Sequence, residues 1–234
     1  MIKKKKKTTT VKKVTKKVET KVIKVQDFNY WATRPLDDPE KDWTYGEKDW
    51  LQGYIFSVEH PHRQLILKAL EDFEWSYLLE IGCNVGPNLA LIRSRWENRA
   101  LFGIDASPLA VNRSKEVLGA NIEVHEGNYN QLPYPSCHFD VVLADATLLY
   151  VSPEEVDQVL SEVNRVVNKR VILVERYADS LKGEVVGHVW GRDYRTLFEK
   201  MGYKTLVDKQ LTEADWPTSI SWQKFGRLFM FQKV

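Results

Sequence analysis

Residues that could do chemistry gather in the stretch LLEIGCNVGPNLALI, residues 78–92. An apolar run leads into Glu80 and Gly82, and Gly86 opens a helix-like pattern. Turns of this kind hold nucleotides, because glycine lets the backbone pass close to a ligand. The middle position holds Asn84, which adopts positive φ at modest cost. Its side chain takes up space that a pyrophosphate would need, so a dinucleotide fits this turn poorly.

Two further positions bear on the ligand. Pro87 stands where the dinucleotide fingerprint carries its third glycine, and it suits the first turn of a helix, where its missing N–H is not needed. No Lys-Ser or Lys-Thr pair follows the glycines, which excludes a P-loop. Asp105 ends the next apolar run, where a carboxylate can accept hydrogen bonds from both hydroxyls of a ribose. Helix capping, the alternative role for Asp105, can be supplied by Ser107 instead.

The cysteines and histidines predict no metal site. Cys83 and Cys137 are the only two cysteines, and they lack metal-type spacing. Cys83 lies inside the glycine turn, so a disulfide framework is not expected and a reducing cytoplasm fits better. His60 and His62 flank a proline without a matching cysteine or carboxylate spacing.

The composition predicts a packed soluble protein with a separate basic arm. The 234 residues suffice for one α/β domain and an extension, and 43% of them are apolar. No run of 18 apolar residues occurs, so no membrane span is expected, and the lysine-rich start lacks the apolar centre of a secretory signal. Residues 1–25 hold eleven lysines and one glutamate; since the whole chain has a formal charge of +2, the remainder carries −8.

Predicted strands and helices alternate and must position these residues. Apolar runs predict strands over residues 77–82, 100–105, 121–127, 139–145, 170–177, 203–211 and 227–233. Helical periodicity marks residues 87–97, 107–118, 153–167 and 192–201. This alternation predicts an α/β fold with a doubly wound, mostly parallel, seven-stranded Rossmann-like sheet. The last two strands have no helix pattern between them, so an antiparallel edge hairpin is expected.

The chain divides into three predicted parts. Residues 1–26 form a basic arm that is solvated, or contacts nucleic acid or an anionic surface weakly through residues 1–25, or docks on the protein or a partner subunit. Residues 27–74 form an aromatic-rich lead-in that ends in a helix; its aromatic side chains form a lid over a ligand or pack as an ordinary subdomain. These aromatic residues are Tyr30, Trp31, Trp43, Tyr45, Trp50 and Tyr54. Residues 75–234 form the α/β domain, whose ligand belongs at the carboxyl ends of the strands.

The stretches LLEIGCNVGPNLALI and LFGIDASPLAV resemble the first two motifs of the class I, Rossmann-like S-adenosylmethionine-dependent methyltransferases, of the type 11/12 kind. The loop of that family has the form acidic-x-G-x-G-x-G, with Asn84 at the second glycine here. Further on, VHEGNYNQLPYPSCHFDVVLADATLLYVSPEEVDQVLSEVNRVV is similar to the third and fourth motifs. Four motifs in order over residues 75–180 are far more specific than one glycine turn.

The resemblance implies S-adenosylmethionine as the cofactor and S-adenosylhomocysteine as its product. The residues implied to hold it are Glu80, Gly82, Cys83, Asn84, Gly86, Asp105, Ala106, Asn128, Tyr129, Ala144 and Asp145. Among these, Glu80 is implied to meet the methionine ammonium, Asp105 the ribose hydroxyls, and Asn128 the adenine amino group. Asn128 stands where the family usually has an aspartate, so weaker binding is implied.

The acceptor side is less defined by the sequence. Methyl transfer needs a general base only if the acceptor is protonated, so the lack of an obvious base does not count against a methyltransferase. Asp145 and Tyr150 could touch the acceptor, with packing as the alternative role for Tyr150. His188, in GEVVGHVWGRDY (183–194), could be a base or a hydrogen-bonded surface residue. DATLLYVSP contains no Asp/Asn-Pro-Pro-Tyr sequence, which disfavours the branch that methylates amino groups of DNA and glutamine.

The sequence therefore predicts a cytoplasmic S-adenosylmethionine-dependent methyltransferase that acts on an O or N atom of a small molecule. Three alternatives stay open: a methyltransferase directed to nucleic acid or protein by the lysine arm, an NAD(P)-dependent oxidoreductase, and a non-catalytic binding module on the same fold. Pro87 and the expected C-terminal hairpin count against the oxidoreductase. The sequence determines neither the acceptor nor the oligomeric state.

Overall fold

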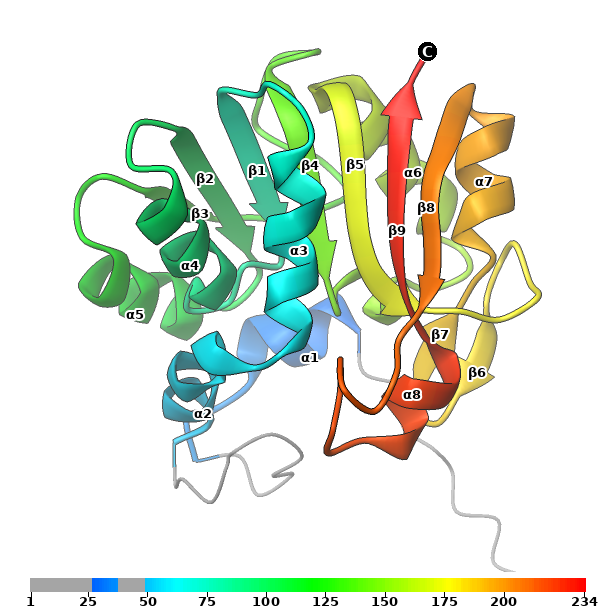
Figure 1. Cartoon of the computed structure of the whole chain (residues 1–234). Coiled ribbons are helices and arrows are strands. Elements are labelled where there is room, and N and C mark those ends of the chain that lie inside the picture. Colours follow the sequence, from blue (N-terminus) through cyan, green and yellow to red (C-terminus); the bar gives the residue numbers. More distant parts are fainter. Residues whose placement is uncertain (1–26, 38–48) are drawn as a thin grey trace, which may run out of the picture.

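The computed structural model describes residues 27–37 and 49–234, which form a seven-stranded sheet covered by helices on both faces (Figure 1). The strand order is β3-β2-β1-β4-β5-β9-β8. The first five strands pair in parallel, and β9 pairs antiparallel with β5 on one side and β8 on the other. The strands are β1 (Tyr77–Ile81), β2 (Ala100–Asp105), β3 (Glu123–Glu126), β4 (Phe139–Asp145), β5 (Val167–Arg176), β8 (Tyr203–Gln210) and β9 (Gly226–Lys233), with β6 (Glu184–Val186) and β7 (Val189–Gly191) in a separate hairpin.

Capping residues and first-turn prolines mark where several of the helices begin. Ser107 caps the helix after β2 by accepting the N–H of Ala110, and a proline occupies the first turn of both helices that follow β1 and β2. The helices are α1 (Phe28–Thr33), α2 (Trp50–Phe56), η1 (Ser57–Glu59), α3 (His62–Glu71), α4 (Pro87–Arg95), α5 (Pro108–Leu118), η2 (Leu148–Tyr150), α6 (Val156–Val166), α7 (Tyr194–Lys200) and α8 (Ile220–Phe225), where η marks 3₁₀ turns.

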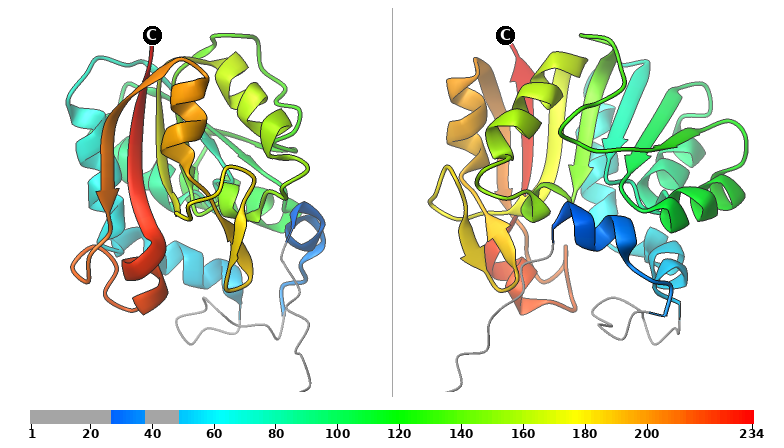
Figure 2. Two further views of the ribbon diagram at one scale, coloured as in Figure 1. Left: turned by 90° about the vertical axis from the view of Figure 1, so that its right-hand side faces the viewer. Right: turned by 180° about the vertical axis from the view of Figure 1, so that it is seen from behind.

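Buried side chains of the strands alternate between two clusters, one on each face of the sheet. The cluster that contains Leu78 includes residues of α3, α4 and α5, whereas the cluster that contains its neighbour Leu79 includes residues of α6 and α7. Figure 2 shows the sheet with helices on both faces. Burial on both faces explains why the strands read as nearly continuous apolar runs. Since helices cover both faces, the loops at the carboxyl ends of the strands are the part of the sheet left for ligands.

The predicted sheet is confirmed, including all seven strands and the antiparallel pairing of the last two. The expectation that no helix separates those two strands is wrong, because α8 lies between them. With six residues, α8 is too short for a periodic signal, and its buried Trp222 fixes it to the core. Segment 183–194 contains the β6–β7 hairpin, which was not predicted. The arm of residues 1–26, Trp43 and Tyr45 lie outside the described residues.

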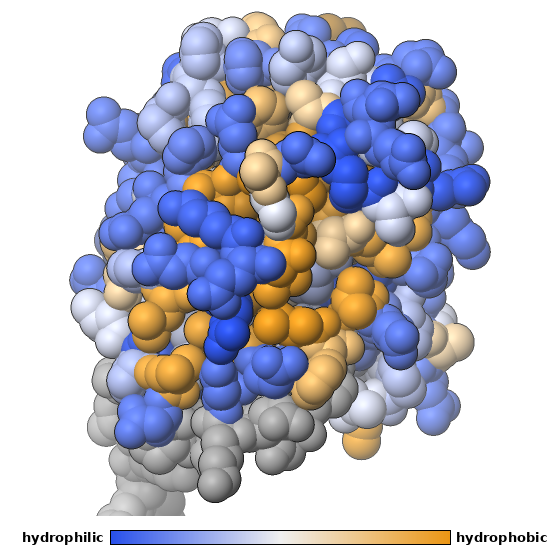
Figure 3. All heavy atoms as spheres, turned by 90° about the vertical axis from the view of Figure 1, so that its left-hand side faces the viewer, coloured by the Kyte–Doolittle hydropathy of each residue, from blue (hydrophilic) through white to orange (hydrophobic). Residues whose placement is uncertain are grey.

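The sheet has an edge at β3, on the side of the molecule seen in Figure 3. Apolar side chains gather in the middle of this face and hydrophilic side chains surround them. In β3 itself Glu123, His125 and Glu126 are exposed, while Val124 is buried. Charged side chains on an edge strand oppose pairing with a further strand.

Among residues 27–37 and 49–234, no helix is long and apolar enough to cross a membrane.

Candidate functional site

The loop between β1 and α4 places three residues in left-handed backbone conformations. Gly82, Asn84 and Gly86 have φ values of 70°, 52° and 81°. A Cβ atom on Gly82 would lie 2.2 Å from Oγ1 of Thr147, and one on Gly86 would lie 2.4 Å from Cδ1 of Leu118. Glycine is therefore required at both ends of the turn, while asparagine tolerates the conformation at its centre.

A cavity of about 650 Å³, named the β2 cavity, lies beside this loop at the carboxyl end of β2. Its wall is formed by Phe28, Trp31, Tyr54, Ile81, Gly82, Asn84, Ile104, Asp105, Ala106, Gly127, Tyr129, Asp145, Ala146, Thr147 and Tyr150. One carboxylate oxygen of Asp105 accepts the N–H of Asn84 and the other that of Ser107, both at 2.8 Å. Each of these oxygens keeps lone-pair capacity for a ligand.

A second cavity, of about 770 Å³ and named the β5 cavity, lies against the ends of β4 and β5. Six residues line both cavities, namely Tyr54, Gly82, Asn84, Asp145, Ala146 and Tyr150. Ala146 has a φ of 54°, a conformation that non-glycine residues rarely adopt, and it turns the chain sharply after Asp145. The two cavities thus meet at the end of β4.

Most of the residues predicted from the sequence lie on these walls. Those on the β2 cavity are Gly82, Asn84, Asp105, Ala106, Tyr129, Asp145 and Tyr150. Those on the β5 cavity include Glu80, Cys83, Tyr150 and His188, besides the shared Gly82, Asn84 and Asp145. Of the predicted residues that the structure describes, Gly86, Asn128 and Ala144 lie on neither wall. Oδ1 of Asn128 accepts the N–H of Asn130 at 2.8 Å, so its implied contact with adenine stays a prediction.

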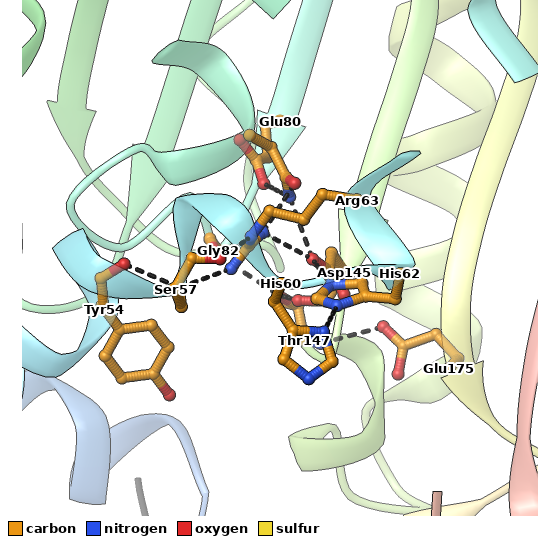
Figure 4. Close-up of polar contacts among 11 residues, drawn as sticks. Tyr54, Ser57, His60, His62, Arg63, Glu80, Gly82, Asp145, Thr147 and Glu175 are labelled. Carbon is orange, nitrogen blue, oxygen red and sulfur yellow. Dashed lines mark hydrogen bonds and ion pairs between the residues drawn. The ribbon is translucent and has the colours of Figure 1, made fainter. Parts of the chain in front are cut away.

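Asp145 is the centre of a buried polar cluster on the shared wall (Figure 4). Its Oδ2 atom accepts hydrogen bonds from Nε2 of His62 at 2.9 Å, Nη1 of Arg63 at 3.0 Å and Nδ2 of Asn88 at 3.0 Å. Burial alone would raise the pKa of Asp145, but these three partners hold the pKa well below its usual range. Asp145 is therefore ionised, and its Oδ1 atom has no hydrogen-bond partner among the described residues.

The cluster continues to Glu80, which is 2% exposed. Arg63 donates to Oδ1 of Asn88 at 2.6 Å, and Asn88 donates to Oε1 of Glu80 at 2.7 Å. The other oxygen of Glu80 is buried without a partner among the residues described. Burial raises the pKa of Glu80 to about 8. Glu80 is therefore protonated at neutral pH in the free protein, and a ligand that brings a positive charge to the unpartnered oxygen would favour its ionised form.

Two fully buried residues, Glu175 and Arg192, hold the turn η2, whose Tyr150 lines both cavities. Glu175 accepts the N–H groups of residues 147, 148 and 149, at 2.9, 2.7 and 3.1 Å. Arg192 donates to the carbonyl oxygens of Leu148, at 3.0 Å, and Val151. Tyr150, between these contacts, has a pKa well above its usual value because of burial, so it keeps its proton at neutral pH.

A column of aromatic rings closes the outer side of the β5 cavity. The His62 ring stacks on Trp216 at 4.3 Å between centroids, and Trp216 stacks on Trp222 at 4.1 Å. The guanidinium of Arg176 lies 4.8 Å from the centre of the Trp222 ring, and its Nε atom is buried without a partner in the described chain. The segment between β8 and β9 carries both tryptophans to the site.

The sequence pointed to three acceptor-side candidates, and Asp145, Tyr150 and His188 all lie on the β5 cavity. It did not point to other polar and aromatic residues of that wall, namely His60, His62, Arg63, Arg176, Trp216 and Trp222. In the sequence, the two histidines raised only the question of a metal site. Within the described residues, no group of three or more histidine, cysteine, aspartate or glutamate side chains is arranged to hold a metal ion.

Comparison with known proteins relates this fold and site to a family. Residues 78–170 match the family model described as a methyltransferase domain. In this part the chain is similar to the class I S-adenosylmethionine-dependent methyltransferases. The matched range runs from β1 into β5 and contains the glycine loop, Asp105 and Asp145. This similarity speaks against the oxidoreductase alternative.

Two curated relatives and one solved structure illustrate the similarity. The carboxy-S-adenosyl-L-methionine synthase of Campylobacter jejuni is 26% identical over 162 residues, covering 66% of each chain. The fatty-acid O-methyltransferase of Mycolicibacterium smegmatis is 26% identical over 151 residues, covering 63% of this chain and 52% of that enzyme. The chain thus spans between half and two thirds of the length of these relatives. Magnesium protoporphyrin IX methyltransferase from Synechocystis PCC 6803, solved with bound SAM, shares the fold with a TM-score of 0.60 at 15% identity, covering 88% and 94% of the two chains.

Proposed function

We propose that this protein transfers the methyl group of S-adenosylmethionine to an O or N atom of a small molecule. The cofactor occupies the β2 cavity and its methionine end reaches the shared wall, while the acceptor occupies the β5 cavity. The observation that carries the proposal is that wall, where Asp145, Ala146 and Tyr150 line both cavities. Two ligands bound on either side of it would meet there, which is what a transfer between them requires.

The residues present suit the cofactor. Asp105 ends β2 with lone-pair capacity on both oxygens for ribose hydroxyls, and Ala106 and Tyr129 line the cavity next to it for the adenine. Glu80 lines the β5 cavity next to the shared wall, so the methionine end extends past that wall for its ammonium to reach the unpartnered Oε2 atom. S-adenosylmethionine supplies a methyl group that is already activated by a positively charged sulfur. The protein then has to align the two reactants and exclude water, and alignment is worth about 7–11 kcal/mol.

A small-molecule acceptor is favoured by the walls of the β5 cavity. Its walls combine apolar and aromatic side chains, such as Leu149, Val189 and Trp222, with a few polar groups. Both curated relatives described above carry names of enzymes that act on small molecules.

Two measurements test the proposal. Calorimetric titration with S-adenosylhomocysteine, beside NAD and NADP, is expected to give binding for the first compound alone. Incubation with methyl-labelled S-adenosylmethionine and a cell extract, divided into small-molecule, protein and nucleic-acid fractions, is expected to label the small-molecule fraction. Label in the nucleic-acid or protein fraction instead would support the alternative that the lysine arm directs the enzyme. The same assay without residues 1–26 shows whether the arm takes part.

A further inference from the structure

Two histidines connect the polar cluster to the wall of the β5 cavity. Nδ1 of His62 lies 2.5 Å from Nδ1 of His60, and Nε2 of His62 lies 2.9 Å from Oδ2 of Asp145. His62 is buried, whereas His60 is half-buried, and both line the cavity. Nε2 of His60 is shielded from solvent and has no hydrogen-bond partner in the part of the chain that the structure describes. This atom points away from His62 and from the rest of the cluster (Figure 4).

The hydrogen bonds determine which nitrogen atoms carry protons. Asp145 is ionised and can only accept, so Nε2 of His62 must donate to it. Burial lowers the pKa of His62, which keeps this imidazole neutral and makes its Nδ1 atom an acceptor. Nδ1 of His60 must then donate to His62. A neutral His60 consequently has its lone pair on Nε2, the atom that lacks a partner among the described residues.

We propose that His60 is the general base of the methyl transfer, and that the acceptor is an aromatic molecule that presents an O–H or ring N–H group to Nε2 of His60. This inference rests on the proposed function. The cavity wall supplies both parts of such a site, because the aromatic side chains of Tyr54, Trp216 and Trp222 line it and His60 offers a hydrogen-bond acceptor. His62 is a positioning residue, since it acts only by fixing the tautomer of His60.

The step balances in atoms and charge. A lone pair of the acceptor oxygen or nitrogen forms a bond to the methyl carbon, while the carbon–sulfur bond breaks and leaves its electron pair on sulfur. The proton of the acceptor moves to Nε2 of His60. The positive charge of the sulfonium thus ends on the His60 imidazolium, which strengthens its hydrogen bond to His62 and, through it, to Asp145. The proton leaves to solvent when the site opens for product release.

The groups that face His60 are His62, Arg63 and Asp145. Burial, followed by His62 and Arg63, lowers the pKa of His60 to about 4, and the opposing effect of Asp145 is smaller. His60 is therefore unprotonated at neutral pH and free to accept a proton. His188 lies on the same cavity wall but belongs to the β6–β7 turn and not to the cluster.

Nitrogen NMR of the full chain with ¹⁵N-labelled histidine tests the proposal, and it does not require the natural acceptor. In the complex with S-adenosylhomocysteine at neutral pH, His60 is expected to carry its proton on Nδ1 and His62 on Nε2. Phenol is then added as the probe, with anisole as its match in shape that lacks the O–H group. Phenol is expected to shift the Nε2 signal of His60, and anisole is expected to leave it in place.

The variant His62→Phe keeps an aromatic ring against Trp216 but removes both hydrogen bonds of the imidazole. It is expected to let the His60 proton exchange between both nitrogen atoms, a change that a merely structural role would not produce. A His60 that carries its proton on Nε2, or that responds equally to phenol and anisole, overturns the proposal. If S-adenosylhomocysteine does not bind, the proposed function fails instead, and the two failures are told apart by calorimetry on the same sample.

Discussion

The β2 cavity and the β5 cavity share a wall, but the chain builds them in different ways. The β2 cavity is centred on residues that end neighbouring parallel strands, and its polar contacts run between the β1 loop and Asp105. The β5 cavity draws on α2, α3, the ends of β4 and β5, the β6–β7 hairpin and the segment before β9. The polar contacts of the first come from local turn chemistry at the carboxyl ends of the strands, whereas the polar contacts of the second join segments far apart in the chain.

The difference also appears in the charges. Asp105 lines only the β2 cavity, and its carboxylate accepts two backbone N–H groups. On the β5 cavity, the charged groups of Asp145 and Arg63 are buried and bound to each other, and Arg192 is buried beside it and bound to backbone carbonyl groups of the turn η2. Buried charges are costly unless every partner is present. The acceptor half of the site should therefore be the more sensitive to changes at a distance.

The largest effect is expected from Arg192→Met, which tests the dependence of the β5 cavity on buried charge. The change leaves the carbonyl groups of Lys182, Leu148 and Val151 without their donor. The free energy of unfolding, measured with urea, should fall by about 3–5 kcal/mol. The matched control is Arg195→Met, since Arg195 is far more exposed and pairs with Asp208 at 3.4 Å. That control should cost about 0–1 kcal/mol, and equal losses would show that burial of the charge is not the cause.

Gly82→Ala is expected to have the next largest effect, because it changes the wall that both cavities share. The new Cβ atom would lie 2.2 Å from Oγ1 of Thr147, in addition to the strain of a positive φ. The loss of unfolding free energy should be about 2–4 kcal/mol, with weaker binding of S-adenosylhomocysteine. Gly202 also has a positive φ, of 87°, but no atom lies within 4 Å of an added Cβ. Gly202→Ala should cost about 1 kcal/mol and leave binding unchanged; a similar loss at both positions would rule out the steric explanation.

Asp105→Asn tests the β2 cavity independently of the β5 cavity. The substitution removes a carboxylate from the β2 cavity and replaces one of its acceptor oxygens by an NH2 group, which can only donate hydrogen bonds. Charge-assisted hydrogen bonds to the ribose are worth about 1.5–3 kcal/mol, so the Kd for S-adenosylhomocysteine should rise about 10- to 100-fold. The histidine tautomers of the β5 cavity should stay as they are, which NMR can check. An unchanged Kd would mean that Asp105 serves only the backbone of residues 84 and 107.

The smallest effect is a pH dependence that comes from Glu80. Its pKa of about 8 means that the free protein holds Glu80 protonated at pH 7, whereas the ammonium of the cofactor requires the carboxylate. Affinity for S-adenosylhomocysteine should therefore rise about fivefold from pH 7 to pH 8. Over the same range the free protein loses stability, because unfolded Glu80 is ionised and folded Glu80 is not. Glu80→Gln should remove the fivefold change; if calorimetry shows the same slope in that variant, another group is responsible.

The sequence predicted the sheet and named several residues that line the β2 cavity, because the information there is local. Gly82 and Gly86 were readable as turn residues, and Asp105 was readable as the last residue of a strand. The carboxyl ends of parallel strands meet at one edge of a sheet, so residues in such positions come together however the helices pack. Asn128 was named because of a family motif, and the side chain of Asn128 lies outside both cavity walls.

By itself, the sequence determined the fold class, the glycine loop and the residue types at the strand ends. Only the tertiary structure decided that His60, His62 and Asp145 form one chain of hydrogen bonds, although 83 residues separate His62 from Asp145. It also brought Trp216 from the segment before β9 onto the ring of His62. The physical reason is that turn chemistry and strand periodicity act over a few residues. The burial of charges depends instead on which surfaces pack together, and no local pattern records that.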